Sequence, residues 1–252
     1  MKSLVWFRSD LRLHDNPALK EASIVSNEIH AVYVFSNEQL LVHNEANVKV
    51  DFLIKNLFSL EEKLKDLNIP LTIVKGSEFE GDSELILRIA EEREIEKVFC
   101  NSEFGEDETN RDYKTLKVLK DSGIGFQSFH DKVIYPPGSL RTGQDKPYSV
   151  FTPFKRKWIE NFDMEFLDID FDYIAKDTTN ISSNIKSFDF DFNQTHQVDM
   201  TNWKEGEEEA KKKLELLLNN KAIDYSKNRN DPIIDGTSRI SPYLALGIIS
   251  PK

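Results

Sequence analysis

The sequence has 252 residues, of which 39% are hydrophobic and 31% charged, and its formal net charge at pH 7 is −11. A chain of this length can bury a sizeable core and form one large or two modest domains. Its single cysteine, Cys100, excludes an internal disulfide and stands in an apolar run typical of a buried strand. No apolar run approaches the roughly 18 residues of a membrane helix, and residues 4–7 are too short for the core of a signal peptide. The sequence therefore predicts a globular, cytoplasmic protein.

The negative charge is confined to the first part of the chain. Residues 203–252 contain 9 Lys and Arg against 8 Asp and Glu, whereas residues 1–202 contain 24 against 36. Proteins bind duplex DNA largely through cationic contacts with phosphate. Any contact with nucleic acid is therefore expected in residues 203–252.

Short apolar runs alternate with amphipathic segments through the first 131 residues. The runs predict strands at 4–7, 29–35, 71–74, 97–100 and 126–129. Helices are predicted between them, first at Pro17 after an Asp15 or Asn16 cap and then at 50–67, 83–93 and 109–120. This alternation predicts a doubly wound, mainly parallel five-stranded sheet of the Rossmann-like α/β class.

Ligands of such sheets bind outside the carboxyl ends of the strands. Three predicted loops lie there, at residues 8–12, 36–44 and 101–108. No glycine-rich phosphate-binding motif opens a predicted helix, which argues against a dinucleotide-dependent dehydrogenase or a P-loop enzyme. No two of the five histidines are three or four residues apart, so no metal site is predicted.

Beyond residue 131 the pattern loses its period until a helical segment begins at Trp203. We therefore predict an α/β domain at residues 1–131, an interdomain linker at 132–202 and the beginning of a helical domain at 203–252. The helical domain is expected to continue beyond Lys252, so this chain is interpreted as an N-terminal fragment. Such a fragment is expected to expose apolar side chains of the unfinished domain, such as Leu244, Leu246 and Ile248.

One polar stretch, residues 235–242, combines a glycine, three hydroxyl side chains and Arg239 directly before Pro242. Ser-Pro is a helix-start pair, so the hydroxyls are expected to cap a helix that begins near Pro242. Free backbone N–H groups, hydroxyls and a guanidinium would also suit a pyrophosphate. An ordinary helix cap and a phosphate site both remain open on these residues alone.

Three separated segments resemble one known family. They are residues 6–19 (WFRSDLRLHDNPAL), 148–154 (YSVFTPF) and 235–250 (DGTSRISPYLALGIIS). In this order they resemble signature segments of the DNA photolyase and cryptochrome family, and they are most similar to the class I enzymes that repair cyclobutane pyrimidine dimers. The resemblance extends from Leu4 to the last residue.

The resemblance implies light-driven repair of cyclobutane pyrimidine dimers in DNA, a carbon–carbon lyase reaction, by electron transfer from reduced FAD. The implied partner is UV-damaged DNA, and the full-length protein is expected to be a monomer. Catalytic residues are expected beyond Lys252, so the fragment alone is expected to be inactive. The alternatives are a cryptochrome-type blue-light photoreceptor and a nucleotide-binding α/β module without photochemistry.

The resemblance also implies particular binding residues. Arg229 matches a family arginine near the DNA-facing side. His43 and Glu108 match residues around an antenna chromophore, 5,10-methenyltetrahydrofolate, with a deazaflavin as the alternative. The positions that match the family's FAD contacts are Tyr225, Thr237, Ser238, Arg239, Ile240 and Ser241.

Overall fold

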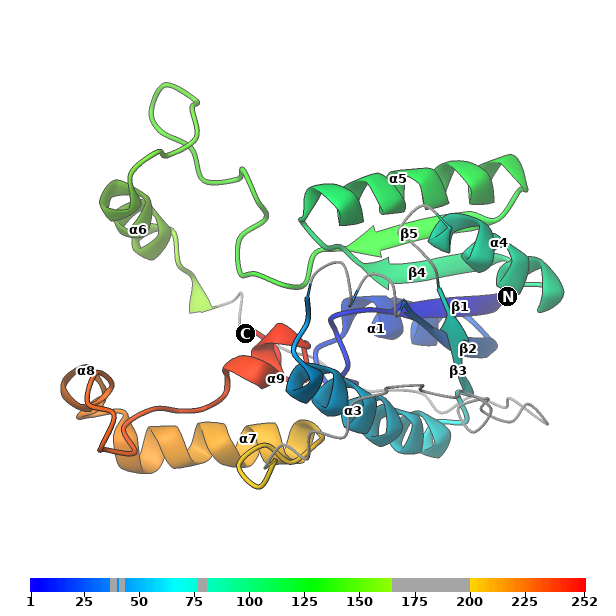
Figure 1. Ribbon diagram of the computed structural model, residues 1–252. Coiled ribbons are helices and arrows are strands. Elements are labelled where there is room, and N and C mark those ends of the chain that lie inside the picture. The colour runs from blue at the N-terminus through cyan, green and yellow to red at the C-terminus, as the bar shows by residue number, and fades with distance from the viewer. Residues whose placement is uncertain (37–39, 41–43, 77–80, 165–199) are drawn as a thin grey trace.

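The computed structural model describes residues 1–36, 40, 44–76, 81–164 and 200–252. Its centre is a five-stranded sheet of order β3-β2-β1-β4-β5, in which every neighbouring pair is parallel (Figure 1). The predicted fold class is confirmed. The strands are β1 (Lys2–Phe7), β2 (Glu28–Phe35), β3 (Leu71–Lys75), β4 (Lys97–Asn101) and β5 (Gly125–Phe129).

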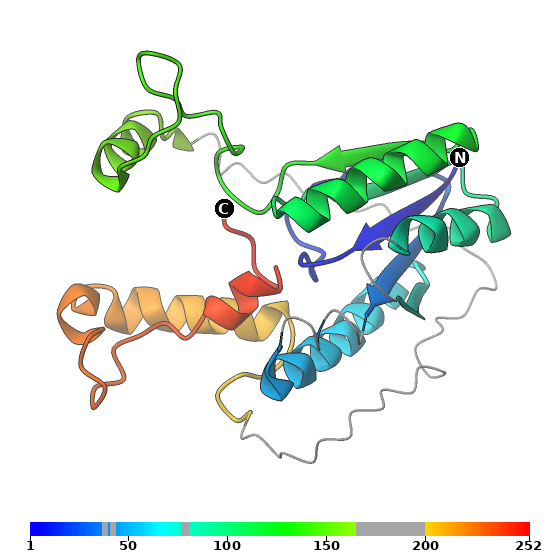
Figure 2. The same cartoon turned by 45° about the horizontal axis from the view of Figure 1, so that its top comes forward.

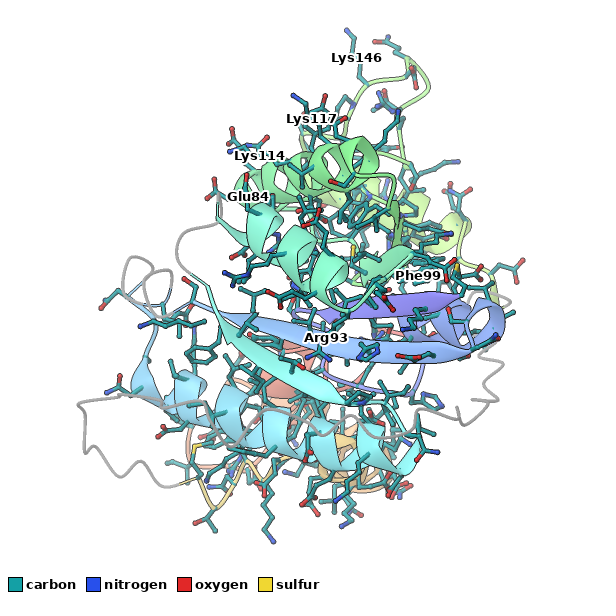
Figure 3. All side chains as sticks on the ribbon, turned by 90° about the vertical axis from the view of Figure 1, so that its right-hand side faces the viewer. Glu84, Arg93, Phe99, Lys114, Lys117 and Lys146 are labelled. Carbon is teal, nitrogen blue, oxygen red and sulfur yellow. The ribbon has the colours of Figure 1, made fainter. Side chains whose placement is uncertain are left out.

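Helices cover both faces of this sheet because successive strand residues point to opposite sides. In β1, Val5 and Phe7 belong to the larger core under α1 (Pro17–Val25) and α3 (Asn47–Asp66). Leu4 and Trp6 instead join a second core under α4 (Asp82–Glu92) and α5 (Glu106–Asp121). Figure 3 shows α4 and α5 on one side of the sheet and α3 on the other, with Glu84, Lys114 and Lys117 pointing outward.

Helix α1 begins where the sequence predicts. The Asn16 side chain accepts a hydrogen bond from the Leu19 amide at 3.1 Å, and Pro17 occupies the first turn. Asn101 at the end of β4 reinforces this start, because its amide donates to Asn16 at 2.8 Å and to the Asp10 carboxylate at 2.7 Å. A buried polar network therefore joins the ends of β1 and β4 to the first helix.

Helix α5 begins three residues earlier than predicted. The sequence analysis assigned Glu106, Asp107 and Glu108 to an acidic loop, and this was wrong. All three lie in the first turn of α5, where carboxylates interact favourably with the positive end of the helix dipole.

The later helices extend the molecule beyond the sheet. They are α6 (Phe151–Glu160), α7 (Glu207–Leu216), a π-helical turn η2 (Leu217–Lys221), α8 (Tyr225–Asn228) and α9 (Ser241–Ala245). Helix α6 lies apart from the sheet and buries none of its residues. Helix α9 lies between the carboxyl ends of the strands and α7 in both Figures 1 and 2.

The C-terminal segment contributes to the core of the α/β part. Tyr243 of α9 packs edge-on against Phe52 of α3 with ring centroids 5.2 Å apart, and Ala210 of α7 belongs to the same core. Of the three side chains expected to be exposed, Leu244 is 40% exposed, Leu246 is partly buried against this core, and the expectation was wrong for Ile248, which is 1% exposed because it packs into the core. The predicted division at residues 131 and 202 stays a prediction. None of the described helices is long and apolar enough to cross a membrane.

Candidate functional site

A cavity of about 860 Å³ lies at the carboxyl ends of the strands. In the sheet, β2 and β3 lie on one side of β1, whereas β4 and β5 lie on its other side. The order in which the chain adds strands therefore changes direction between β1 and β4. In open α/β sheets this reversal leaves a crevice that binds ligands. The cavity lining includes Arg8, just after β1, and Glu103, just after β4. Both belong to loops that the sequence placed at this edge.

Arg8, Arg111 and Glu103 line the cavity, and Asp112 pairs with both arginines from behind this lining. The Arg8 guanidinium donates to Asp112, and the Arg111 guanidinium donates to Glu103 at 3.0 Å and to Asp112 at 3.1 Å. Burial opposes ionisation of Glu103, but Arg8, Arg111 and Lys132 outweigh it and lower its pKa to about 2. Both guanidinium groups therefore already have carboxylate partners.

The same two arginines pack against the aromatic ring of Trp6. Their guanidinium carbons lie 5.0 Å (Arg8) and 4.9 Å (Arg111) from the centre of the Trp6 ring, within cation–π distance. Across the cavity, residues of the C-terminal segment, including Trp203 and Leu246, complete the lining. The cavity is thus aromatic and apolar for most of its surface, with polar groups at its inner end.

Three buried polar atoms of cavity-lining residues have no hydrogen-bond partner among the described residues. They are Oδ1 of Asp82, the indole Nε1 of Trp203 and Nε of Arg8, which lies within ion-pair distance of the Glu103 carboxylate at 3.8 Å. Asp82 is 3% exposed, and burial raises the pKa of its carboxyl to about 6. Because an unpartnered buried polar group is costly, these atoms indicate a surface built to meet a ligand.

A set of buried polar contacts, called the clamp below, holds Leu246 and Gly247 against the loop after β1. The Leu11 amide donates to the Leu246 carbonyl at 3.1 Å, and Arg12 donates to the Gly247 carbonyl at 3.1 Å and pairs with Asp131. Gly247 has φ of 61°, and a Cβ there would lie 2.6 Å from the Asp10 Cα. The cavity wall formed by α9 is therefore held in place by this loop.

The predicted FAD-contacting residues lie in and between α8 and α9. Tyr225 begins α8, Ser241 begins α9, and the others occupy the intervening loop. Gly236 packs directly on α8, because a Cβ there would lie 2.8 Å from the Asn228 carbonyl oxygen. The Arg229 guanidinium, predicted to face DNA, is exposed and lies 5.9 Å from the Tyr225 ring centre.

Arg239 is engaged by protein groups. Its guanidinium pairs with the Asp235 carboxylate at 3.0 Å and donates to the Asn202 side chain at 2.8 Å. Lys221 also pairs with Asp235, at 2.9 Å, and a hydrogen bond from Lys221, followed by the charge of Arg239, lowers the Asp235 pKa. Arg239 has φ of 54°. The guanidinium is thus held beside the loop by other side chains.

The predicted helix start is confirmed, but the predicted cap is wrong. Helix α9 begins at Ser241 with Pro242 in its first turn, and no side chain caps it. The cap position is Ile240, because Ser241 is already the first helical residue. The exposed hydroxyls of Thr237 and Ser241 make no hydrogen bond to another described residue, which leaves them available to a ligand.

The structure describes only one of the two predicted antenna residues. Glu108 is half-buried in the first turn of α5 and lines the cavity, whereas His43 lies outside the described residues. Sequence reasoning did not identify Asp82, Arg111 or Trp203 as site residues. Asp82 and Trp203 are remote in sequence from the loops that the sequence placed at this edge, and Arg111 lies just beyond the third of these loops. Asp82 also stands at a helix start, where acidic residues are common without any ligand.

Comparison with known proteins agrees with this architecture. The family model described as DNA photolyase matches residues 3–171. A deoxyribodipyrimidine photo-lyase of Vibrio cholerae is 31% identical to this chain over 99% of its length. The crystal structure of a bacterial class III photolyase of Agrobacterium tumefaciens superposes on 99% of the chain with a TM-score of 0.86, at 26% sequence identity. An archaeal photolyase of Sulfolobus tokodaii has a TM-score of 0.73 over 99% of the chain at 23% identity, which is a likeness of fold.

The chain belongs to the DNA photolyase family, because the family model covers more than half of its residues. Membership of this family implies a flavin cofactor. The chain spans about half the length of these relatives, 53% of the Vibrio protein, 51% of the Agrobacterium chain and 53% of the Sulfolobus chain.

Proposed function

We propose that this chain is part of a flavin-dependent photolyase that uses light to split cyclobutane pyrimidine dimers in DNA. The observation that carries the proposal is the 31% identity with the Vibrio deoxyribodipyrimidine photo-lyase over 99% of the chain. FAD would supply the electron that opens the dimer when light excites it. The residues of this chain would bind and orient the flavin.

The proposed function is tested by repair of a thymine-dimer oligonucleotide under near-ultraviolet or blue light. The substrate is incubated with the protein extended to the full length of its relatives and carrying reduced FAD. We expect the dimers to disappear in light and to persist in the dark. Persistence in the light, with the flavin bound and reduced, would contradict repair and favour a cryptochrome-type photoreceptor. The 252-residue chain is expected to be inactive by itself.

The loop between α8 and α9 fits the phosphates of FAD through its hydroxyls. Thr237 and Ser241 carry hydroxyls without a protein partner among the described residues, and Gly236 brings this loop against α8, where Tyr225 lies. Because Arg239 already pairs with Asp235, we assign it the role of holding the loop. Ser238 and Ile240 would approach the flavin from the same loop. Arg229, exposed on α8, is proposed to contact DNA.

This arrangement predicts different effects for two loop substitutions. In the FAD-loaded protein, Thr237→Ala is expected to weaken FAD binding by roughly 2- to 13-fold, the effect of losing a neutral hydrogen bond of about 0.5 to 1.5 kcal/mol. Arg239→Ala is expected to leave the affinity unchanged and to lower the unfolding temperature instead. The measurements are FAD fluorescence titration and thermal unfolding of each variant.

Ser226→Ala is the matched control, because this hydroxyl is exposed on α8 in the same region. It is expected to change neither the affinity nor the unfolding temperature. A loss of FAD affinity of tenfold or more in Arg239→Ala would instead place the guanidinium on the phosphates. Normal affinity in Thr237→Ala would remove its hydroxyl from the site.

We further propose that the cavity at the carboxyl ends of the strands holds a second, light-harvesting chromophore. Glu108 lines this cavity, and its predicted companion His43 lies outside the described residues. The Sulfolobus protein, which shares this fold, is described with two FAD molecules that imply a novel light-harvesting cofactor, and this supports the proposal of a second chromophore. The proposed occupant is 5,10-methenyltetrahydrofolate, with a deazaflavin as the alternative.

A further inference from the structure

We propose that His30, Glu28 and Arg93 form an acid-sensitive lock that fastens the end of α4 to the sheet and opens when His30 takes up a proton. The lock lies near the amino end of β2, whereas the cavity lies at the carboxyl ends of the strands. It is therefore separate from the proposed flavin and chromophore sites, and it depends on neither of them.

The His30 side chain is buried and has a partner at each ring nitrogen. His30 is 1% exposed, its Nε2 lies 2.7 Å from a Glu28 carboxylate oxygen, and the Arg93 guanidinium lies 3.1 Å from its Nδ1. Arg93 directly follows α4, and it also donates to the Thr72 hydroxyl of β3 at 3.0 Å. One arginine thus ties the end of α4 to two neighbouring strands, and Figure 3 shows it over the sheet.

These contacts determine where the neutral ring carries its proton. A guanidinium has only donors, so Nδ1 of His30 must accept the hydrogen bond from Arg93. The ring proton is then on Nε2 and is donated to the Glu28 carboxylate. A second proton would bind at Nδ1, where it would face the N–H groups of Arg93. Protonation of His30 therefore removes the hydrogen bond from Arg93 and places two cations side by side.

The surroundings of His30 favour its neutral form. Burial, aided by the charges of Arg93 and of Lys2 in β1, lowers the pKa of His30 against the opposing effect of Glu28. The Glu28 side chain is 28% exposed, so water screens its attraction. Thr72, the β3 partner of Arg93, carries no charge. Because the unfolded chain binds the proton more readily, the free energy of unfolding should decrease as the pH falls below about 6.5, the ordinary pKa of histidine.

Opening of the lock should loosen the end of α4 first. The Ile95 amide donates to the Ala90 carbonyl at 2.8 Å just beyond this helix, and both residues belong to the second core. Without the contacts of Arg93, this turn would lose its connection to β2 and β3. The first residue of the same helix is Asp82, which lines the cavity. Acid would therefore act on a helix that forms part of the cavity.

The test compares urea denaturation of the wild type and of His30→Gln at about pH 7.5 and about pH 5.5. Glutamine keeps an N–H that can donate to Glu28, but it cannot be protonated. We expect the wild type to lose stability at the lower pH and His30→Gln to lose less. Burial raises the pKa of Asp82 to about 6, so the difference between the two proteins, rather than either curve alone, reports on His30. His14→Gln is the control, since His14 is exposed, and it should keep the acid loss of the wild type.

Two further measurements apply even if His30→Gln does not fold. Nitrogen NMR shifts of the His30 ring should show the proton on Nε2 in the neutral form, and Arg93→Gln should raise the pH at which this ring titrates. Hydrogen exchange of the Ile95 amide in the wild type, corrected for the intrinsic effect of pH, should lose protection at the lower pH. The expected loss is about 2- to 13-fold, the effect of losing one neutral hydrogen bond.

Three results would overturn the lock. The first is an equal acid loss of stability in the wild type and in His30→Gln. The second is a larger acid loss in His30→Gln than in the wild type, which would mean that the attraction of Glu28 outweighs burial and Arg93. The third is a neutral His30 ring with its proton on Nδ1, which is incompatible with the hydrogen bond from Arg93. All measurements use the chain without flavin, so they leave the proposed function untouched.

Discussion

Replacing Arg12 by Met is expected to lower the free energy of unfolding by about 3 to 5 kcal/mol, the usual effect of removing one partner of a buried ion pair. Arg12 is 1% exposed, and its guanidinium pairs with the equally buried Asp131. It also donates to the Gly247 carbonyl at 3.1 Å and to the Asp15 carbonyl at 2.6 Å. Without Arg12, the Asp131 carboxylate and these carbonyls would remain buried without their partner.

Urea denaturation of Arg12→Met measures this effect, with Arg88→Met as the control. Arg88 is exposed on α4 and lies 3.9 Å from the Glu92 carboxylate, so its loss should change the stability by less than about 0.5 kcal/mol. Adding Asp131→Asn to Arg12→Met should destabilise less than the sum of the single changes, because both remove one interaction. A loss below about 1 kcal/mol in Arg12→Met would show that the clamp does not depend on this pair.

Gly247→Ala is expected to destabilise the protein by about 2 to 5 kcal/mol, through two additive effects. A left-handed φ of 61° is unfavourable for alanine by about 1 to 2 kcal/mol. The new Cβ would also lie 2.6 Å from the Asp10 Cα and against the Ser9 carbonyl, and overpacking of this kind adds about 1 to 3 kcal/mol. Because both obstacles are backbone atoms, the segment around α9 must move away from the loop after β1.

Gly123→Ala separates the two effects. Gly123 has φ of 74°, but a Cβ there meets nothing within 4 Å, so only the backbone term of about 1 to 2 kcal/mol applies. Hydrogen exchange of the Leu11 amide, which donates to the Leu246 carbonyl, reports on the displacement directly. We expect faster exchange in Gly247→Ala and unchanged exchange in Gly123→Ala. Equal destabilisation by the two substitutions would mean that the contact with the loop is not tight.

These two substitutions matter for the function because the clamped segment forms part of the cavity. Pro242 and Leu246 line the cavity on one side, and Arg8 lines it from the loop that the same segment contacts. Gly247→Ala and Arg12→Met should therefore weaken binding of a ligand in the cavity as well as lower the stability of the protein.

The sequence by itself determined the α/β fold because its signals are local. Short apolar runs identified the strands and amphipathic segments the helices, and Asn16 with Pro17 marked the start of α1. The rule that ligands bind at the carboxyl ends of the strands then located Arg8 and Glu103 at the cavity. The start of α5 was misplaced because acidic residues suit both a loop and the first turn of a helix.

The tertiary structure alone decided which side chains meet. Trp6, Asp82 and Trp203 line one cavity although the chain separates them widely, and no periodic pattern encodes such convergence. Asp131 and the Gly247 carbonyl, the partners of Arg12, are far from it in the sequence and meet it only in the folded chain. Arg239 pairs with Asp235 and has a left-handed φ of 54°, a backbone conformation that a sequence pattern does not reveal. Contacts between distant segments follow from how the elements pack, and packing depends on the whole core rather than on any one stretch.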